Sequence, residues 1–376
     1  MRSCVLQTHP IYESHTSEHL SEMLTDALAE WKLDRVNSII PVTTDNAKKY
    51  SECYRFSSGT WATDRVRKVV SFFHRSTTAV HALKTKQDML ELPVHKLIYD
   101  VRTRWNYTYD MLERYVEQQA AIYSAVMDKD MKKKVKDIEL LTESETKLAE
   151  GLIDILKPLK NVITLMSTET SPSVSTIIPL QKMILKSMTS SAEDSTTIKE
   201  AKAAITKDLK GRYNDPGVQD YLHRATALDP RFKSLPYLEE ACVQKIYDDL
   251  TRDIVDIDKQ GQSSEAQAAS SSSGAEPGPL ETSPPQKKSA MAIVFADFFK
   301  TEESVDEDLL AWWKSNEHKY PHIAKLAQRN LAVQGSSVPS ERVFSTAGDI
   351  VTASRSRLLA ENLDKLIFLQ KNMKIK

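Results

Sequence analysis

Residues 338–350 read "VPSERVFSTAGDI", and this stretch decides how the fold is interpreted. A proline in the second position favours the first turn of a helix, and a glycine such as Gly348 is a typical helix stop. The pattern therefore predicts a short helix that ends at Gly348. Its buried face is expected to hold Val343, Phe344 and Ala347. Glu341 lies on the flank of that face, either as an ordinary first-turn acid or as the last carboxylate of a metal-binding catalytic set.

The composition excludes several classes of protein. The 376 residues have a formal net charge of −1, so any contact with DNA must come from local basic patches. Three distant cysteines without CxxC spacing predict neither a disulfide framework nor a zinc finger. No apolar run approaches the roughly 20 residues that span a membrane. P-loop, GxSxG and HExxH motifs do not occur. We expect an intracellular protein with no membrane contact and no small-molecule substrate.

A stretch rich in Ser, Gly, Pro and Ala divides the chain. Residues 259–288 carry almost no large apolar side chain, so burial cannot offset the entropy lost on ordering them. We predict a disordered linker at 257–289. It separates an N-terminal part at 1–62 and a helical region at 63–256 from a C-terminal module at 290–376.

Hydrophobic periodicity predicts helices over most of the chain. An amphipathic pattern follows Thr16 and Ser17, and apolar residues at helical spacing continue from about 63 to 255, where Pro158 is expected to kink or end one helix. Residues 36–42 favour a short buried strand that Asp45 stops. The basic run at 131–137 either grips phosphates or is a solvated face, and we interpret it as solvated.

The C-terminal module holds more large apolar residues than a unit of its size can bury. Two adjacent tryptophans precede Pro321, which should begin a new helix, and a final apolar helix follows. We expect a partner chain or a second domain to bury the excess.

Several stretches together resemble hAT-type DNA transposases, above all their domesticated relatives, the zinc finger BED domain-containing proteins. In the first half they are "SIIPVTTDNA" at 38–47 and "DVRTRWNYTYDMLER" at 100–114. In the second half they are "ALDPRFKSL" at 227–235, "SVPSERVFSTAG" at 337–348 and "RSRLLAENLDKLIFLQKN" at 355–372. The resemblance covers most of the chain in the order expected for the family.

The resemblance implies a mostly α (α+β) fold. A ribonuclease-H-like core, of which 1–62 is a remnant, would be interrupted by a large all-helical insertion and closed by the C-terminal hAT dimerisation module. The dimer contacts are expected at Trp312, Trp313, Tyr320, Leu326, Phe344, Leu363, Leu366 and Phe368. Asp45 and Glu341 would occupy the second and third catalytic acids of a two-metal phosphoryl-transfer site. Arg104 and Trp105 would contact DNA, with Trp105 stacked on a displaced base; a core tryptophan is the alternative.

Two parts of the family pattern are missing from the sequence. No stretch like Asp-Gly-Trp-Thr supplies the first catalytic acid, and no BED zinc finger occurs. We therefore predict a truncated core without its first catalytic strand, no enzyme activity and no cofactor. The predicted function is that of a transposase-derived nuclear protein that forms homodimers and associates with DNA or chromatin in transcription regulation. One alternative is an active hAT-type transposase that uses Mg²⁺ or Mn²⁺. Another is a helical interaction scaffold without DNA contact.

Overall fold

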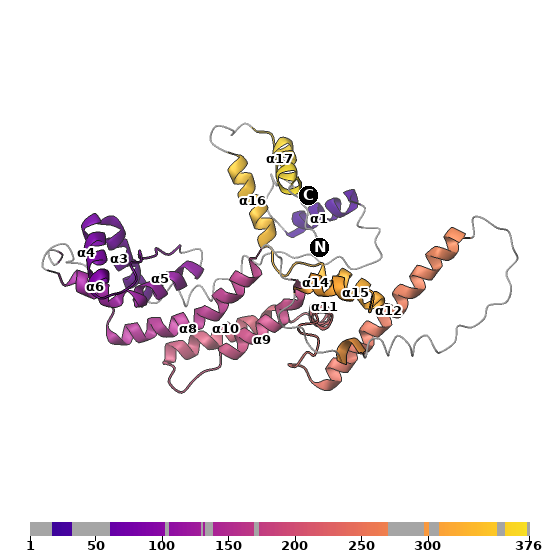
Figure 1. Ribbon diagram of the computed structural model, residues 1–376, viewed down its shortest axis with the longest axis horizontal. Helices are drawn as coiled ribbons and strands as arrows, with labels where there is room; N and C mark the ends of the chain where they lie inside the picture. Colours follow the sequence, from indigo (N-terminus) through magenta and orange to yellow (C-terminus); the bar gives the residue numbers. More distant parts are fainter. Residues whose placement is uncertain are drawn as a thin grey trace.

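The computed structural model describes residues 17–31, 61–101, 105–128, 131, 138–168, 173–269, 297–300, 308–351 and 358–373. These residues are mostly helical, which confirms the prediction of a mostly helical chain (Figure 1). They form no sheet, although Ser173 and Gln334 make an isolated antiparallel bridge. The strand expected at 36–42 lies outside the described residues, so the ribonuclease-H-like core stays a prediction.

Four short helices form one end of the molecule. They are α3 (Trp61–Arg75), α4 (Thr77–Met89), α5 (Trp105–Glu117) and α6 (Gln119–Val126). The apolar run through α3 and α4 is split at Ser76, whose side chain accepts a hydrogen bond from the Ala79 backbone N–H at 3.2 Å. Because a serine in this position starts a new helix, one continuous apolar pattern becomes two helices that pack against each other.

The long helix α8 (Glu143–Met166) connects this end to the middle of the molecule. Thr142 and Glu145 form a capping box at its start. The helix continues through Pro158, so the expected helix end at that proline is wrong. It packs on α5 and on the pair α9 (Ile177–Ser187) and α10 (Thr196–Arg212), and one apolar core runs through these elements.

A second core joins segments far apart in sequence. It contains residues of α11 (Pro216–Ala227), of α12 (Glu240–Ala269), of α14 (Leu309–Asn316) and of α15 (Pro321–Leu331). Pro321 begins α15 as predicted. α12 reaches Ala269, so the first part of the predicted linker at 257–289 is helical. The reason is that 257–269 holds Asp, Lys, Gln, Glu and Ala without a proline, and most of these residues favour a helix.

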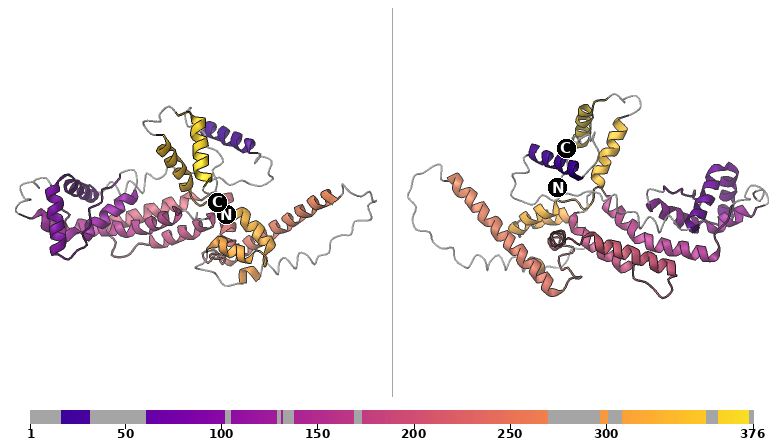
Figure 2. Two further views of the ribbon diagram at one scale, coloured as in Figure 1. Left: turned by 45° about the horizontal axis from the view of Figure 1, so that its top comes forward. Right: turned by 180° about the vertical axis from the view of Figure 1, so that it is seen from behind.

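Two further helices form a hairpin that stands apart from both cores. α16 (Val338–Ile350) and α17 (Ala360–Asn372) pack against each other, and among the described helices neither makes another extensive contact. The N-terminal helix α1 (Ser17–Glu30) lies beside α17 in each view of Figures 1 and 2. Gly348 does not stop α16 as predicted. A Cβ at Gly348 would meet nothing within 4 Å, and the helix runs on to Ile350.

Candidate self-association surface

A cluster of aromatic rings fixes α14 and α15 on α12. Phe298 is fully buried at its centre, with its ring centroid 5.5 Å from that of Trp313 in a stacked arrangement. Tyr320 meets Phe298 edge-on, also at 5.5 Å. Tyr247 of α12 stacks on Phe299 at 3.7 Å. Aromatic pairs at such distances contribute beyond the area that they bury, so the cluster holds Phe298, Trp313 and Tyr320 firmly against α12.

A buried lysine fastens the same cluster to the loop before α12. Lys233 is almost fully buried, and its Nζ donates a hydrogen bond of 2.6 Å to the Phe298 carbonyl. The Nζ also lies 4.9 Å from the centre of the Phe298 ring. The Tyr247 hydroxyl donates to the Lys233 carbonyl at 2.9 Å. A buried ammonium needs such partners to offset its desolvation, which makes the position specific for a long cationic side chain.

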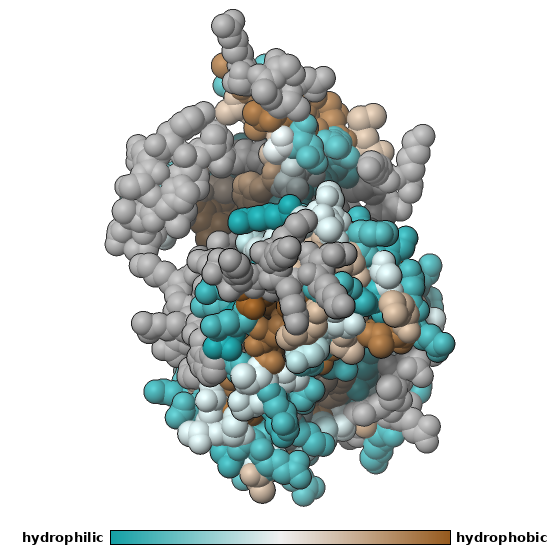
Figure 3. All heavy atoms as spheres, turned by 90° about the vertical axis from the view of Figure 1, so that its left-hand side faces the viewer, coloured by the Kyte–Doolittle hydropathy of each residue, from teal (hydrophilic) through white to brown (hydrophobic). Residues whose placement is uncertain are grey.

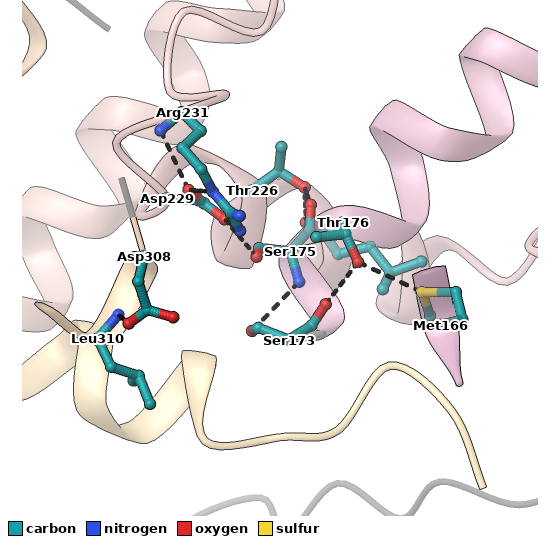
Figure 4. A network of polar contacts seen from close by, with 10 residues as sticks. Met166, Ser173, Ser175, Thr176, Thr226, Asp229, Arg231, Asp308 and Leu310 are labelled. Atoms are coloured by element: carbon teal, nitrogen blue, oxygen red, sulfur yellow. Dashed lines mark hydrogen bonds and ion pairs between the residues drawn. The ribbon is translucent and has the colours of Figure 1, made fainter. Parts of the chain in front are cut away.

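Asp229 organises a second, polar junction beside the aromatic cluster (Figure 4). Its carboxylate is fully buried and accepts a 2.6 Å hydrogen bond from the Ser175 hydroxyl. Arg231 approaches the same carboxylate with two nitrogens, Nε at 3.0 Å and Nη2 at 2.8 Å. The hydrogen bond from Arg231 to Asp229 raises the pKa of Arg231 above its ordinary value despite burial, and the nearby charge of Asp308 adds to this. The junction thus joins the turn before α9 to the loop after α11.

Hydrogen bonds to backbone carbonyls tie the start of α16, and the residues just before it, to the end of α8 and to the turn before α9. The Val174 N–H donates to the Val333 carbonyl at 3.0 Å, and the Ser336 hydroxyl donates to the Met166 carbonyl at 2.8 Å. Arg342 donates to the Ser167 carbonyl. The base of the α16–α17 hairpin is therefore anchored, and the rest of the hairpin extends away from that anchor.

The hairpin carries an exposed apolar surface, which we call the hairpin face. It consists of Phe344, Val351, Leu359, Leu366, Leu369 and Met373, all at least 40% exposed. Leu366 and Leu369 are three residues apart and lie on one side of α17, and Met373 directly follows that helix. Phe344 lies on α16, and Val351 directly follows that helix. Brown spheres gather at the upper end of the molecule in Figure 3, the end that α16 and α17 form in Figure 1.

The residues predicted for the dimer contact separate into two groups. Trp313, Tyr320 and Leu326 are buried in the second core, and Trp312 is partly buried against it. These side chains pack against α11 and α12 of their own chain. Of the two expected ways to bury them, a partner chain or another part of the same chain, the structure shows the second. Phe344, Leu366 and Phe368 are exposed, and Leu363 is half-buried. The predicted buried face of α16 is wrong for Phe344, which is 69% exposed because no element covers that side of the hairpin among the described residues.

The predicted catalytic positions are not brought together in the described residues. Glu341 is exposed in the first turn of α16, where its carboxylate lies 3.5 Å from the Ser337 hydroxyl. The positive end of the helix dipole stabilises an acidic side chain in the first turn. This is the ordinary first-turn role that the sequence left open for Glu341. Asp45 and Arg104 lie outside the described residues, and α5 begins at Trp105, whose side chain is likewise not described. Among described residues, no three His, Cys, Asp or Glu side chains gather to hold a metal ion.

The segment that leads to Arg104 and Trp105 is held by a buried ion pair. Arg67 of α3 is buried, and its Nε donates to the Asp100 carboxylate at 2.7 Å while Nη1 contacts Asp64 at 2.6 Å. Burial lowers the pKa of Arg67, but the bonds and charges of Asp100 and Asp64 outweigh it, so the net shift is upward. This pair fixes the backbone just before the predicted DNA-contacting residues.

Comparison with known proteins places these features in a family. Residues 293–373 match the hAT family C-terminal dimerisation region, and residues 57–155 match the ZBED1 RNase-like helical domain. In these two parts the chain is similar to hAT-family proteins. The predicted resemblance is confirmed. The hairpin and the aromatic residues Phe298, Trp313 and Tyr320 lie within the matched dimerisation region.

Three curated relatives agree with this family. Zinc finger BED domain-containing protein 4 of Homo sapiens is 29% identical over 82% of this chain, and zinc finger protein 618 of Mus musculus is 26% identical over 72%. Zinc finger BED domain-containing protein DAYSLEEPER of Arabidopsis thaliana is 25% identical over 75%. The chain spans 27% of the length of each of the first two and 42% of the third. In the part of this hAT-related chain that the structure describes, no helix is long and apolar enough to cross a membrane.

Sequence reasoning missed the buried and partly buried polar residues of the loop between α11 and α12. Asp229, Arg231 and Lys233 all lie in "ALDPRFKSL", which was noticed as a family marker without a structural role. Arg231 and Lys233 alternate with less polar residues after Asp229 and Pro230, a pattern that an exposed loop can also have. The sequence alone therefore does not reveal that these charged residues are buried or partly buried. Ser175 gives no signal at all, because its partner is distant in sequence.

Proposed function

We propose that this chain is part of a transposase-derived protein that pairs with a second copy of itself through the hairpin face. The observation that supports this is the position of the hairpin face inside the matched dimerisation region, with large apolar side chains left in solvent. Soluble monomers rarely expose contiguous apolar patches of that kind. The tryptophan pair is less suited to the role, because Trp313 is only 8% exposed.

The test is the mass of the full chain by sedimentation across a dilution series. The double substitution Phe344→Ser/Leu369→Ser should weaken pairing by about tenfold or more, since exposed aromatic and aliphatic anchors dominate interface energies. Phe368→Ser is the matched control. Phe368 is 41% exposed, close to the 47% of its neighbour Leu369, but it lies about 160° around the helix from Leu366. Loss of pairing in Phe368→Ser alone would place the contact on the other side of α17.

We further propose that the chain does not cleave DNA by itself. The support is the resemblance, which places only two of the family's three catalytic acids in these residues, at Asp45 and Glu341. The two metal ions of such a site need carboxylates on both sides to offset their charge. Incubation with supercoiled plasmid and Mg²⁺ or Mn²⁺ should give no nicking above a Glu341→Gln control. Nicking that this substitution removes would favour the alternative of an active transposase.

A nuclear location and association with DNA complete the proposal, by analogy with the family alone. Two of the relatives carry a zinc finger BED domain in their names, and the chain itself has nearly balanced charge. Weak, salt-dependent binding of a labelled duplex is expected, with Arg104→Ala/Trp105→Ala weaker still. No binding at low ionic strength would favour the alternative of a helical scaffold.

A further inference from the structure

The N-terminal helix α1 is amphipathic and lies next to the hairpin. Leu24, Leu28 and Trp31 follow the i, i+4, i+7 spacing of a single stripe, and Leu24 and Trp31 are each 43% exposed. Glu22, Asp26 and Glu30 lie on another side of the same helix. Among the described helices, none packs extensively on α1. Its place beside α17 holds in every ribbon view, although more than 300 residues separate the two in sequence.

The size of the hairpin gives a reason for an additional element. α16 and α17 have 13 residues each, and the hairpin face that they carry consists of six exposed apolar residues. A standard protein interface uses roughly 20–30 residues on each side. The hairpin alone therefore falls short of an ordinary stable interface. α1, with 14 residues, is the described helix that lies beside it.

We infer that the surface that binds the second copy is composite, with α1 adding Leu24 and Trp31 to the hairpin face. The inference rests on the proposed self-association and extends it beyond residues 293–373, the matched dimerisation region. The occupant is a second copy because α1 lies beside α17, which belongs to that region. The two helices of the hairpin carry charges of both signs, which suits self-complementary contact: Arg342, Lys365 and Lys371 with Asp349, Glu361 and Asp364.

The test compares three variants of the full chain by sedimentation across a dilution series. Leu24→Ser/Trp31→Ser should weaken self-association by about tenfold or more, as expected when two apolar anchors are lost. Val80→Ser/Tyr123→Ser is the matched control, because these side chains are 45% and 55% exposed on α4 and α6, away from the hairpin, and no change is expected. Leu24→Met/Trp31→Phe keeps the apolar character of α1 and should retain pairing within threefold.

Each contrary result has a distinct meaning. If the wild-type chain pairs and the serine variant of α1 pairs equally well, the composite surface is wrong while the proposed function stands. If the conservative variant loses pairing as strongly as the serine variant, the effect belongs to the folding of α1, and the inference is overturned. A wild-type chain that stays monomeric at every concentration would remove the proposed self-association and this inference with it.

Discussion

The two halves of the matched dimerisation region have similar apolar content and opposite surroundings. In the first half, α14 and α15 bury Trp313, Tyr320 and Leu326 against α11 and α12. In the second half, α16 and α17 bury little more than Ile367 and leave Phe344 and Leu369 in solvent. The first half is thereby part of the core of its own chain. The second half leaves its large apolar side chains exposed.

The difference shows that an excess of apolar residues does not identify an interface by itself. Aromatic residues are enriched both in cores and at the centres of interfaces, and the physical chemistry of burial is the same in both. What separates the halves is whether a helix of the same chain lies opposite. Substitutions in the two halves should therefore act on different quantities, the free energy of unfolding in the first and the dissociation constant in the second.

The largest effect is expected from Trp313→Ala in the buried half. Removing this ring from contact with Phe298 leaves a cavity, and we expect a loss of about 3–5 kcal/mol in the free energy of unfolding. Denaturant unfolding followed by circular dichroism measures it. A loss below about 1 kcal/mol, together with impaired pairing, would move the tryptophan to the interface and erase the distinction between the halves.

The next largest loss in the free energy of unfolding is expected from a substitution in the polar junction around Asp229. Asp229→Ala removes the buried carboxylate that Arg231 and Ser175 contact, and it leaves a cation only a quarter exposed without its partner. Because solvent reaches part of the Arg231 guanidinium, we expect the free energy of unfolding to fall by about 2–3 kcal/mol, which is less than the full cost of a buried unpaired charge. The same unfolding experiment checks this. Val80→Ser on a distant exposed site should change the stability by less than about 0.5 kcal/mol.

A smaller effect on the free energy of unfolding is expected from the protonation of His223 on α11 as the pH falls. Burial lowers the pKa of His223 below its ordinary value of 6.5, the nearby Lys182 lowers it further, and Asp220 opposes both. The unfolded chain then binds a proton at a pH where the folded chain does not, so stability is full above about 6.5 and falls as the pH drops below it. Unfolding curves from pH 7.5 down to 5.5 test this. His223→Gln should flatten the decline, and an unchanged slope would exclude this histidine as the cause.

The smallest change in stability is expected in the exposed half. Phe344→Ser should alter the free energy of unfolding by less than about 0.5 kcal/mol, since its ring is 69% exposed. The same variant should still weaken pairing in a dilution series. Destabilisation as large as that of Trp313→Ala would mean that the ring is covered in the folded monomer, and the two halves would then be alike.

Local patterns predicted most of the described elements. The start of α1 at Ser17, the start of α15 at Pro321 and the helical character of 63–255 follow from capping residues and from apolar spacing. The helix ends expected at Pro158, as one of two outcomes, and at Gly348 are both wrong, and both concern single residues that weaken a helix locally. Packing on both sides of α8 and open space beside Gly348 let those helices continue.

The sequence by itself determined the family and the helices, because motifs and periodicity are properties of neighbouring residues. Only the tertiary structure decided which apolar residues of the C-terminal region are core and which are surface. That choice depends on α12 meeting Phe298 and Trp313, which lie far from it in the sequence, and on Asp229 meeting Ser175, 54 residues away. Contacts between residues so far apart leave no pattern in the spacing of a single sequence. From the sequence alone, the two tryptophans and the hairpin face are equally apolar, and only the folded chain shows which of them is buried.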